Sequence, residues 1–143
     1  MSKCRSILVV DDNAAVRRSL VEVLRLEGFQ TFEAQDGLRA QRTLATLPKP
    51  ALLFLDLMMP NMSGWEFIER CTSEIAAGDL LIVTISAVQA VHSFDNPRPL
   101  SVIANLRKPF SIDAVLDLAE QHCLTESEVA DLADSKPVDG NHL

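Results

Sequence analysis

The sequence predicts an α/β domain: a doubly wound, five-stranded parallel sheet with helices on both faces. Apolar runs of strand length alternate along the chain with segments whose apolar residues recur at helical spacing. Parallel strands need crossover connections, and helices are the usual ones. The first run also lacks the apolar–polar alternation of a half-exposed strand, so that strand is expected to be buried on both faces.

The first strand and helix are expected near the amino terminus. Residues 6–10 are Ser6 followed by four aliphatic residues, a run that is typical of a buried strand. Asn13 is expected to cap the following helix and Gly28 to end it. The apolar residues between them share one helical face: Val16, Leu20, Val23 and Leu24.

The second and third strands follow at 29–34 and 51–55. Asp36 is expected to cap the helix between them, which ends before Pro48. Its apolar face is predicted to contain Leu38, Leu44 and Leu47. The helix after the third strand begins at a capping box of Ser63 and Glu66. Its apolar residues are Trp65, Phe67, Ile68 and Cys71.

The fourth and fifth strands are expected at 80–85 and 102–106. Between them, residues 87–100 contain two prolines that a helix interior does not tolerate. We therefore expect an atypical fourth helix, at most a short one over 88–93, followed by an irregular connection. Ser111 is expected to cap the last helix, whose apolar face contains Ile112, Val115, Leu116, Ala119 and Cys123.

Composition narrows the class of protein. A hydrophobic fraction of 48% and a charged fraction of 23% are ordinary for a soluble globular domain. No apolar run is long enough for a membrane span or a secretory signal, so we expect a cytoplasmic protein without membrane contact. The three cysteines lack metal-ligand spacing and are expected to be reduced thiols. A net charge of −7 argues against direct nucleic-acid binding.

The domain is predicted to span residues 1–123 and to be followed by a polar, acidic tail, 124–143. Thr125 and Glu128 have the spacing of a capping box, which predicts a short helix in that tail. The remainder has few large apolar residues, and we expect it to be disordered.

Polar residues stand where the predicted strands end. Asp11 and Asp12 follow the first strand, Asp56 the third, Ser86 the fourth and Lys108 the fifth. Ligands of open α/β sheets bind at this edge. Carboxylates gathered there repel one another unless a hard cation such as Mg²⁺ neutralises them. The set predicts phosphoryl transfer to Asp56, with Lys108 and Ser86 contacting phosphoryl oxygens.

This set resembles the signature of the receiver (CheY-like) domains of two-component response regulators. Three segments carry the resemblance: Ile7-Leu-Val-Val-Asp-Asp-Asn13, Asp56-Leu-Met-Met-Pro-Asn-Met-Ser-Gly64 and Lys108-Pro109-Phe110. They occur in the family's order and spacing, and the resemblance covers residues 6–123. It implies the flavodoxin-like strand order 2-1-3-4-5, for which this family is a standard example.

The resemblance also implies a division of labour in the site. Asp12, Asp56 and the backbone carbonyl of Met58 would hold Mg²⁺, with Asp11 acting mainly through water. Ser86 would move toward the phosphoryl group. The Lys108–Pro109 peptide bond would be cis, a form that X-Pro bonds tolerate.

By the same resemblance, a histidine kinase or histidine phosphotransfer protein would phosphorylate Asp56, and an unidentified downstream protein would read the change. The chain would be a phosphoacceptor that assists its own phosphorylation and dephosphorylation, and not an enzyme. Two features depart from the family. Asn105 occupies a position where many receivers carry Tyr or Phe. Met58 and Val88 are apolar where polar groups often lie near the attacking water, so we expect slow hydrolysis.

Two other functions remain as alternatives. A phosphohydrolase of the haloacid dehalogenase type would carry a second acid at position 58, which is Met here. A pseudo-receiver would act as an interaction module without phosphorylation. Such domains usually lack one of the acids or the lysine, and this sequence retains them all.

Overall fold

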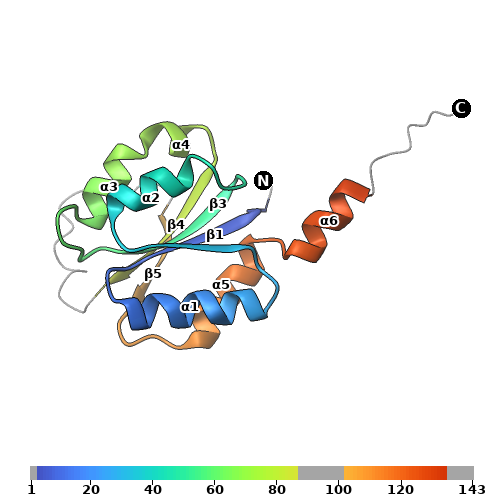
Figure 1. Ribbon diagram of the computed structural model, residues 1–143, viewed down its shortest axis with the longest axis horizontal. Coiled ribbons are helices and arrows are strands. Elements are labelled where there is room, and N and C mark those ends of the chain that lie inside the picture. The colour runs from blue at the N-terminus through green and yellow to red at the C-terminus, as the bar shows by residue number, and fades with distance from the viewer. Residues whose placement is uncertain (1–2, 87–101, 135–143) are drawn as a thin grey trace, which may run out of the picture.

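The computed structural model describes residues 3–86 and 102–134, which form a five-stranded sheet packed between helices (Figure 1). All strand pairs are parallel, and their order is β2-β1-β3-β4-β5. The strands are β1 (Ser6–Val10), β2 (Thr31–Ala34), β3 (Ala51–Asp56), β4 (Leu80–Ser86) and β5 (Val102–Arg107). The predicted fold class and strand order are thus confirmed.

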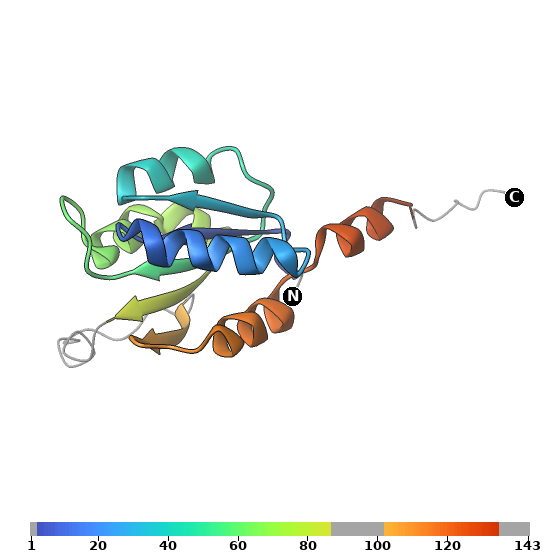
Figure 2. The same ribbon diagram turned by 60° about the horizontal axis from the view of Figure 1, so that its bottom comes forward.

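The helices cover both faces of the sheet. They are α1 (Ala14–Leu26), α2 (Gly37–Leu44), α3 (Gly64–Arg70), α4 (Thr72–Ala76), α5 (Ile112–His122) and α6 (Glu126–Asp134). Figures 1 and 2 show α1 and α5 on one face and α2, α3 and α4 on the other. Each face has its own buried apolar cluster, because alternate residues of the central strands point to opposite sides. On β3, for example, Leu53 and Leu55 belong to one cluster and Leu52 and Phe54 to the other.

The predicted helix starts are confirmed. The side chains of four cap residues each accept a hydrogen bond from the backbone N–H three residues later: Asn13, Asp36, Ser63 and Ser111. Gly28, with a φ of 94°, follows α1 in the left-handed conformation that glycine adopts easily. These local signals place the loops, and therefore the strand ends, at the edge that carries the polar residues.

Several details differ from the sequence prediction. Leu38 is 53% exposed, because the buried face of α2 is formed by Ala40 and Leu44. In α5, Ile112 is 39% exposed, whereas Val115 and Ala119 are fully buried. The predicted third helix ends at its C-cap residue Cys71, and α4 follows as a separate short helix. In both α2 and α5, the apolar face predicted from the sequence includes a residue of the first turn that lies beside, and not within, the buried face of the helix.

The predicted tail helix is present as α6, and its capping box is complete. Thr125 accepts the Glu128 N–H at 3.2 Å, and Glu128 accepts the Thr125 N–H at 2.9 Å. Between α5 and α6 the chain passes the amino-terminal end of β1, where the Leu124 N–H donates to the Cys4 carbonyl at 2.9 Å. Both views show α6 extending away from the sheet. The domain boundary after residue 123 stays a prediction.

Two predictions fall on residues outside the described ranges. They are the short helix over 88–93 with its irregular connection, and the disorder at the end of the tail. Within the described part of the chain, no helix is long and apolar enough to cross a membrane.

Candidate functional site

The three acids predicted from the sequence meet at the carboxyl edge of the sheet. Asp11 and Asp12 follow β1, and Asp56 is the last residue of the neighbouring β3. One carboxylate oxygen from each lies within 4.8 Å of the others. Asp11 and Asp56 are buried, with 0% and 2% exposure, whereas Asp12 is exposed. The fold therefore gathers negatively charged side chains where two of the three are largely shielded from solvent.

The two buried carboxylates are each oriented by a local turn of the same kind. In each, Oδ1 accepts a backbone N–H from two residues further along, Asn13 for Asp11 and Met58 for Asp56, both at 2.9 Å. The remaining oxygens face a common cation. Lys108 Nζ lies 3.5 Å from Asp11 Oδ2 and 3.6 Å from Asp56 Oδ2. Both distances exceed a good hydrogen bond, so Lys108 acts here as a shared point charge.

The electrostatics of this group favour an additional cation. Burial, together with the nearby Asp11 charge, raises the pKa of Asp56 to about 6, against the lowering influence of the Met58 N–H and Lys108. Asp11 Oδ2 is the one buried side-chain oxygen or nitrogen in the described ranges without a hydrogen-bond partner. An orphaned anionic oxygen beside two more carboxylates is a ligand set that suits a hard divalent cation such as Mg²⁺.

Backbone geometry also brings the β3–α3 loop close to Asp56. A Cβ on Gly64 would lie 2.8 Å from both the Asp56 carbonyl oxygen and the Leu57 Cα. Only glycine permits this approach, so α3 can begin directly beside the acidic group. At the other side, the Lys108–Pro109 peptide bond is cis, as predicted.

Comparison with known proteins identifies the family. The family described as "Response regulator receiver domain" matches residues 7–120, which is most of the chain. The chain belongs to this family. It is a receiver domain of two-component response regulators, and Asp56, Asp11, Asp12 and Lys108 occupy the edge where the sequence predicted its site.

Individual relatives cover this receiver domain to different extents. Sporulation initiation phosphotransferase F of Bacillus subtilis is 31% identical over 116 residues, which are 81% of this chain and 91% of the relative. Transcriptional regulatory protein PdtaR of Mycobacterium tuberculosis is 36% identical over 118 residues, 81% of this chain and 55% of that protein. This chain thus spans nearly all of one relative and about half of the other.

A similar solved structure is response regulator TrrA of Thermotoga maritima in complex with Mg²⁺ and beryllium fluoride. Its TM-score is 0.65 at 26% identity, and the match covers 82% of this chain and 97% of that one. A member of the same fold family has thus been seen with the cation that the acidic group of this receiver domain suits.

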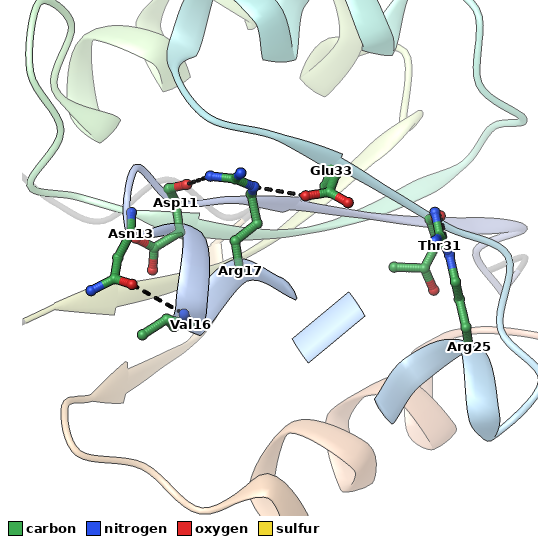
Figure 3. A network of polar contacts seen from close by, with 7 residues as sticks. All are labelled: Asp11, Asn13, Val16, Arg17, Arg25, Thr31 and Glu33. Carbon is green, nitrogen blue, oxygen red and sulfur yellow. Dashed lines mark hydrogen bonds and ion pairs between the residues drawn. The ribbon is translucent and has the colours of Figure 1, made fainter. Parts of the chain in front are cut away.

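The structure adds a buried arginine that sequence reasoning did not single out. Arg17 of α1 is 7% exposed and lies between Asp11 and Glu33 (Figure 3). Its Nη1 donates to the Asp11 carbonyl at 2.9 Å, and its Nε donates to Glu33 on β2 at 2.8 Å. The arginine thereby fixes the backbone that presents Asp11. Its only sequence signal is a charge at a position otherwise expected to face the core.

The predicted site residue Ser86 has a partner that was also missed. It is fully buried at the end of β4, and its Oγ donates to Asn105 Oδ1 on β5 at 3.2 Å. Thr84, two residues earlier on the same face of β4, donates to the same oxygen at 2.7 Å. Two hydroxyl residues at this interval on a buried strand are the signal that an acceptor must lie opposite.

Proposed function

We propose that this receiver domain accepts a phosphoryl group on Asp56, in the presence of Mg²⁺, from a histidine kinase or a histidine phosphotransfer protein. The phosphorylated form then changes contacts with a downstream protein. One observation carries the proposal most directly. Two buried carboxylates, Asp11 and Asp56, each turn one oxygen toward Lys108, and one of those oxygens has no hydrogen-bond partner.

In the transfer, an Asp56 carboxylate oxygen forms a bond to phosphorus while the bond from phosphorus to the donor breaks. For a phosphohistidine donor, the leaving imidazole nitrogen keeps the electron pair. Lys108, already between the carboxylates, lies where it can neutralise a phosphoryl oxygen. Ser86 would donate its hydroxyl proton to another. Positioning and charge neutralisation provide most of the catalysis in reactions of this kind.

Mg²⁺ would be held by Asp12, Asp56 and the Met58 carbonyl, with Asp11 nearby, as the resemblance implies. When bound, the cation neutralises negative charge on the carboxylates and on the incoming phosphoryl group. The raised pKa of Asp56 supports this assignment, because the deprotonated carboxylate is disfavoured there without added positive charge.

The domain acts in this proposal as an acceptor and not as an enzyme, because Asp56 is consumed in each transfer. The side chain of Met58, which is 67% exposed beside the acidic group, has no proton to give to a leaving group. The second acid that a phosphohydrolase of the haloacid dehalogenase type uses is therefore missing from this position.

The test is the intact mass of the protein after incubation with acetyl phosphate and Mg²⁺. We expect one added phosphoryl group, which Asp56→Ala and addition of a chelator abolish. Asp79→Asn is a matched control, because Asp79 directly precedes β4 and so lies at the opposite edge of the sheet. It should leave the added mass unchanged.

Absence of the adduct in folded protein would call for a phosphorylated histidine protein as donor. Absence with that donor as well would contradict the proposal. A domain that keeps its fold, binds Mg²⁺ and takes no phosphoryl group from either donor would be an interaction module that works without phosphorylation.

A further inference from the structure

Three polar side chains form a compact cluster between β4 and β5. Asn105 Oδ1 accepts a hydrogen bond from Thr84 Oγ1 at 2.7 Å and another from Ser86 Oγ at 3.2 Å. Thr84 and Asn105 are register partners, so the amide lies directly across from one hydroxyl and diagonally from the other. Thr84 is 1% exposed and Ser86 is 0% exposed.

Burial explains why an amide occupies this position. Leu80 and Ile82 begin the same face of β4 and contribute to an apolar cluster, and Thr84 and Ser86 continue that face. A buried hydroxyl without an acceptor is destabilising. An aliphatic side chain at position 105 would remove the acceptor of the Ser86 proton and leave Thr84 Oγ1 only the Ala104 carbonyl, at 3.5 Å. Asn105 is therefore matched to the two hydroxyls and not merely a departure from the family's aromatic residue.

The two bonds differ in strength. Hydrogen bonds between oxygens are most common near 2.7–2.8 Å. The bond from Thr84 falls in this range, whereas the bond from Ser86, at 3.2 Å, is longer. The Thr84 bond therefore fixes the amide, and the Ser86 bond is the weaker of the two.

Ser86 also lies beside the phosphoacceptor. Asp56 pairs in register with Ile85, so Ser86 is the next residue of β4 at the carboxyl edge. Its hydroxyl has one proton to donate. An anionic phosphoryl oxygen on Asp56 is a stronger acceptor than a neutral amide oxygen, because charge-assisted hydrogen bonds are roughly twice as strong.

We infer that Asn105 is a positioning residue that holds the Ser86 hydroxyl in the unphosphorylated domain and gives it up to a phosphoryl group on Asp56. This inference rests on the proposed phosphorylation of Asp56. Asn105 competes with the phosphoryl group for one proton. The bond from Thr84 keeps the amide in place when that proton changes its acceptor.

The test measures competition through the affinity for beryllium fluoride, a phosphoryl mimic, in the presence of Mg²⁺. Bound fluoride is followed by ¹⁹F NMR. Asn105→Leu removes the competing acceptor at nearly constant size, so we expect the dissociation constant to fall by about 2- to 10-fold, the contribution of one hydrogen bond. Asn105→Asp keeps the size and offers a charged acceptor, so we expect the dissociation constant to rise.

A double-mutant cycle separates positioning from a general structural role. In a Ser86→Ala background, Asn105→Leu should no longer change the affinity. Thr31→Val is a matched control, because Thr31 carries a buried hydroxyl on β2 that donates to the Phe29 carbonyl at 3.0 Å. It should lower the stability without changing the affinity.

The inference is overturned if Asn105→Leu leaves the affinity unchanged, weakens it, or has the same effect in the Ser86→Ala background. These outcomes are distinct from failure of the proposed function. If the wild-type protein gains a phosphoryl mass and the cycle shows no coupling, only the role of Asn105 is wrong. If the wild type gains no mass from either donor and binds no beryllium fluoride, both proposals are wrong.

Discussion

Two hydrogen-bond networks flank the site. At the end of β1, Arg17 donates to Glu33 at 2.8 Å and to the Asp11 carbonyl at 2.9 Å. At the ends of β4 and β5, two hydroxyls donate to the Asn105 oxygen at 2.7 and 3.2 Å. The first network is short and charge-assisted. The second is neutral, and one of its bonds is long. Both position a residue of the same functional site.

The difference indicates a division between the two sides of the site. The β1 side presents Asp11, whose place must not change if a cation and a phosphoryl group are to meet there. A buried guanidinium with charged and backbone partners gives that rigidity. The β4–β5 side presents Ser86, whose hydroxyl would change its partner if Asp56 is phosphorylated as proposed. A shared neutral acceptor permits that change at little cost in free energy.

The largest expected effect concerns the ionisation of Asp56, which burial and, to a smaller extent, the Asp11 charge on the β1 side disfavour. Its folded pKa is about 6, and an unfolded aspartate has a pKa of about 3.9. Between these values the folded state holds more protons, so this carboxyl makes stability fall as pH rises from about 4 to 6. In the wild type, this should lower the free energy of unfolding by up to about 3 kcal/mol between these pH values. We expect Asp56→Asn to abolish this decrease, measured by urea unfolding in the presence of a chelator. An equal pH dependence in both proteins would exclude Asp56 as the source.

The next effect tests the rigid side directly. Arg17→Leu leaves Glu33 and the Asp11 carbonyl without their donors, and we expect a loss of about 2 kcal/mol in the free energy of unfolding, because Glu33 is partly exposed. Arg18→Leu, on the exposed face of the same helix, should change stability by less than about 0.5 kcal/mol. Equal losses in the two variants would mean that the network does not hold the loop.

A kinetic effect is expected at the loop between the two sides. The exposed side chain of Met58 can neither accept nor donate a proton for an attacking water. We expect Met58→Asn to shorten the lifetime of the aspartyl phosphate by about tenfold, less than a general acid or base contributes, because an amide can only orient the attacking water. Loss of the phosphoryl mass over time measures this. A wild-type half-life of seconds would contradict the expectation of slow hydrolysis.

The smallest effect tests the neutral side. Thr84→Val removes one donor to Asn105 and keeps the shape of the strand, so we expect a loss of about 1 kcal/mol in denaturant unfolding. This should be less than the loss from Arg17→Leu. A larger loss would reverse the comparison and make the β4–β5 network the more rigid one.

Much of the fold could be predicted, because its signals are local. Caps such as Asn13 and Ser111 act over three residues, and wholly apolar runs mark buried strands without knowledge of their neighbours. The acids and Lys108 could be placed together because parallel strands align their carboxyl ends. Leu38 was misplaced because a leucine in the first turn of a short helix can lie beside the buried stripe while smaller Ala40 fills it.

The two networks could not be predicted for a different reason. Arg17 meets Glu33 only through the pairing of β1 with β2, and Asn105 meets Ser86 only through the register of β4 with β5, which shifts between Ile82 and Val83. A one-residue change of register sends a side chain to the other face of a sheet. Contacts of this kind depend on long-range pairing that no local pattern encodes.

The attachment of α6 and the candidate site lie at opposite ends of the sheet. The Glu126 N–H donates to the Gly28 carbonyl at 2.7 Å, so the chain leaves beside the carboxyl end of α1 and the start of β1 (Figure 2). Asp56 lies at the opposite end of the strands. A fluorescent protein or second folded unit joined beyond α6 would therefore leave the approach to Asp56 open to a kinase. Under the proposed function, a unit attached at this end would not obstruct phosphorylation at the other.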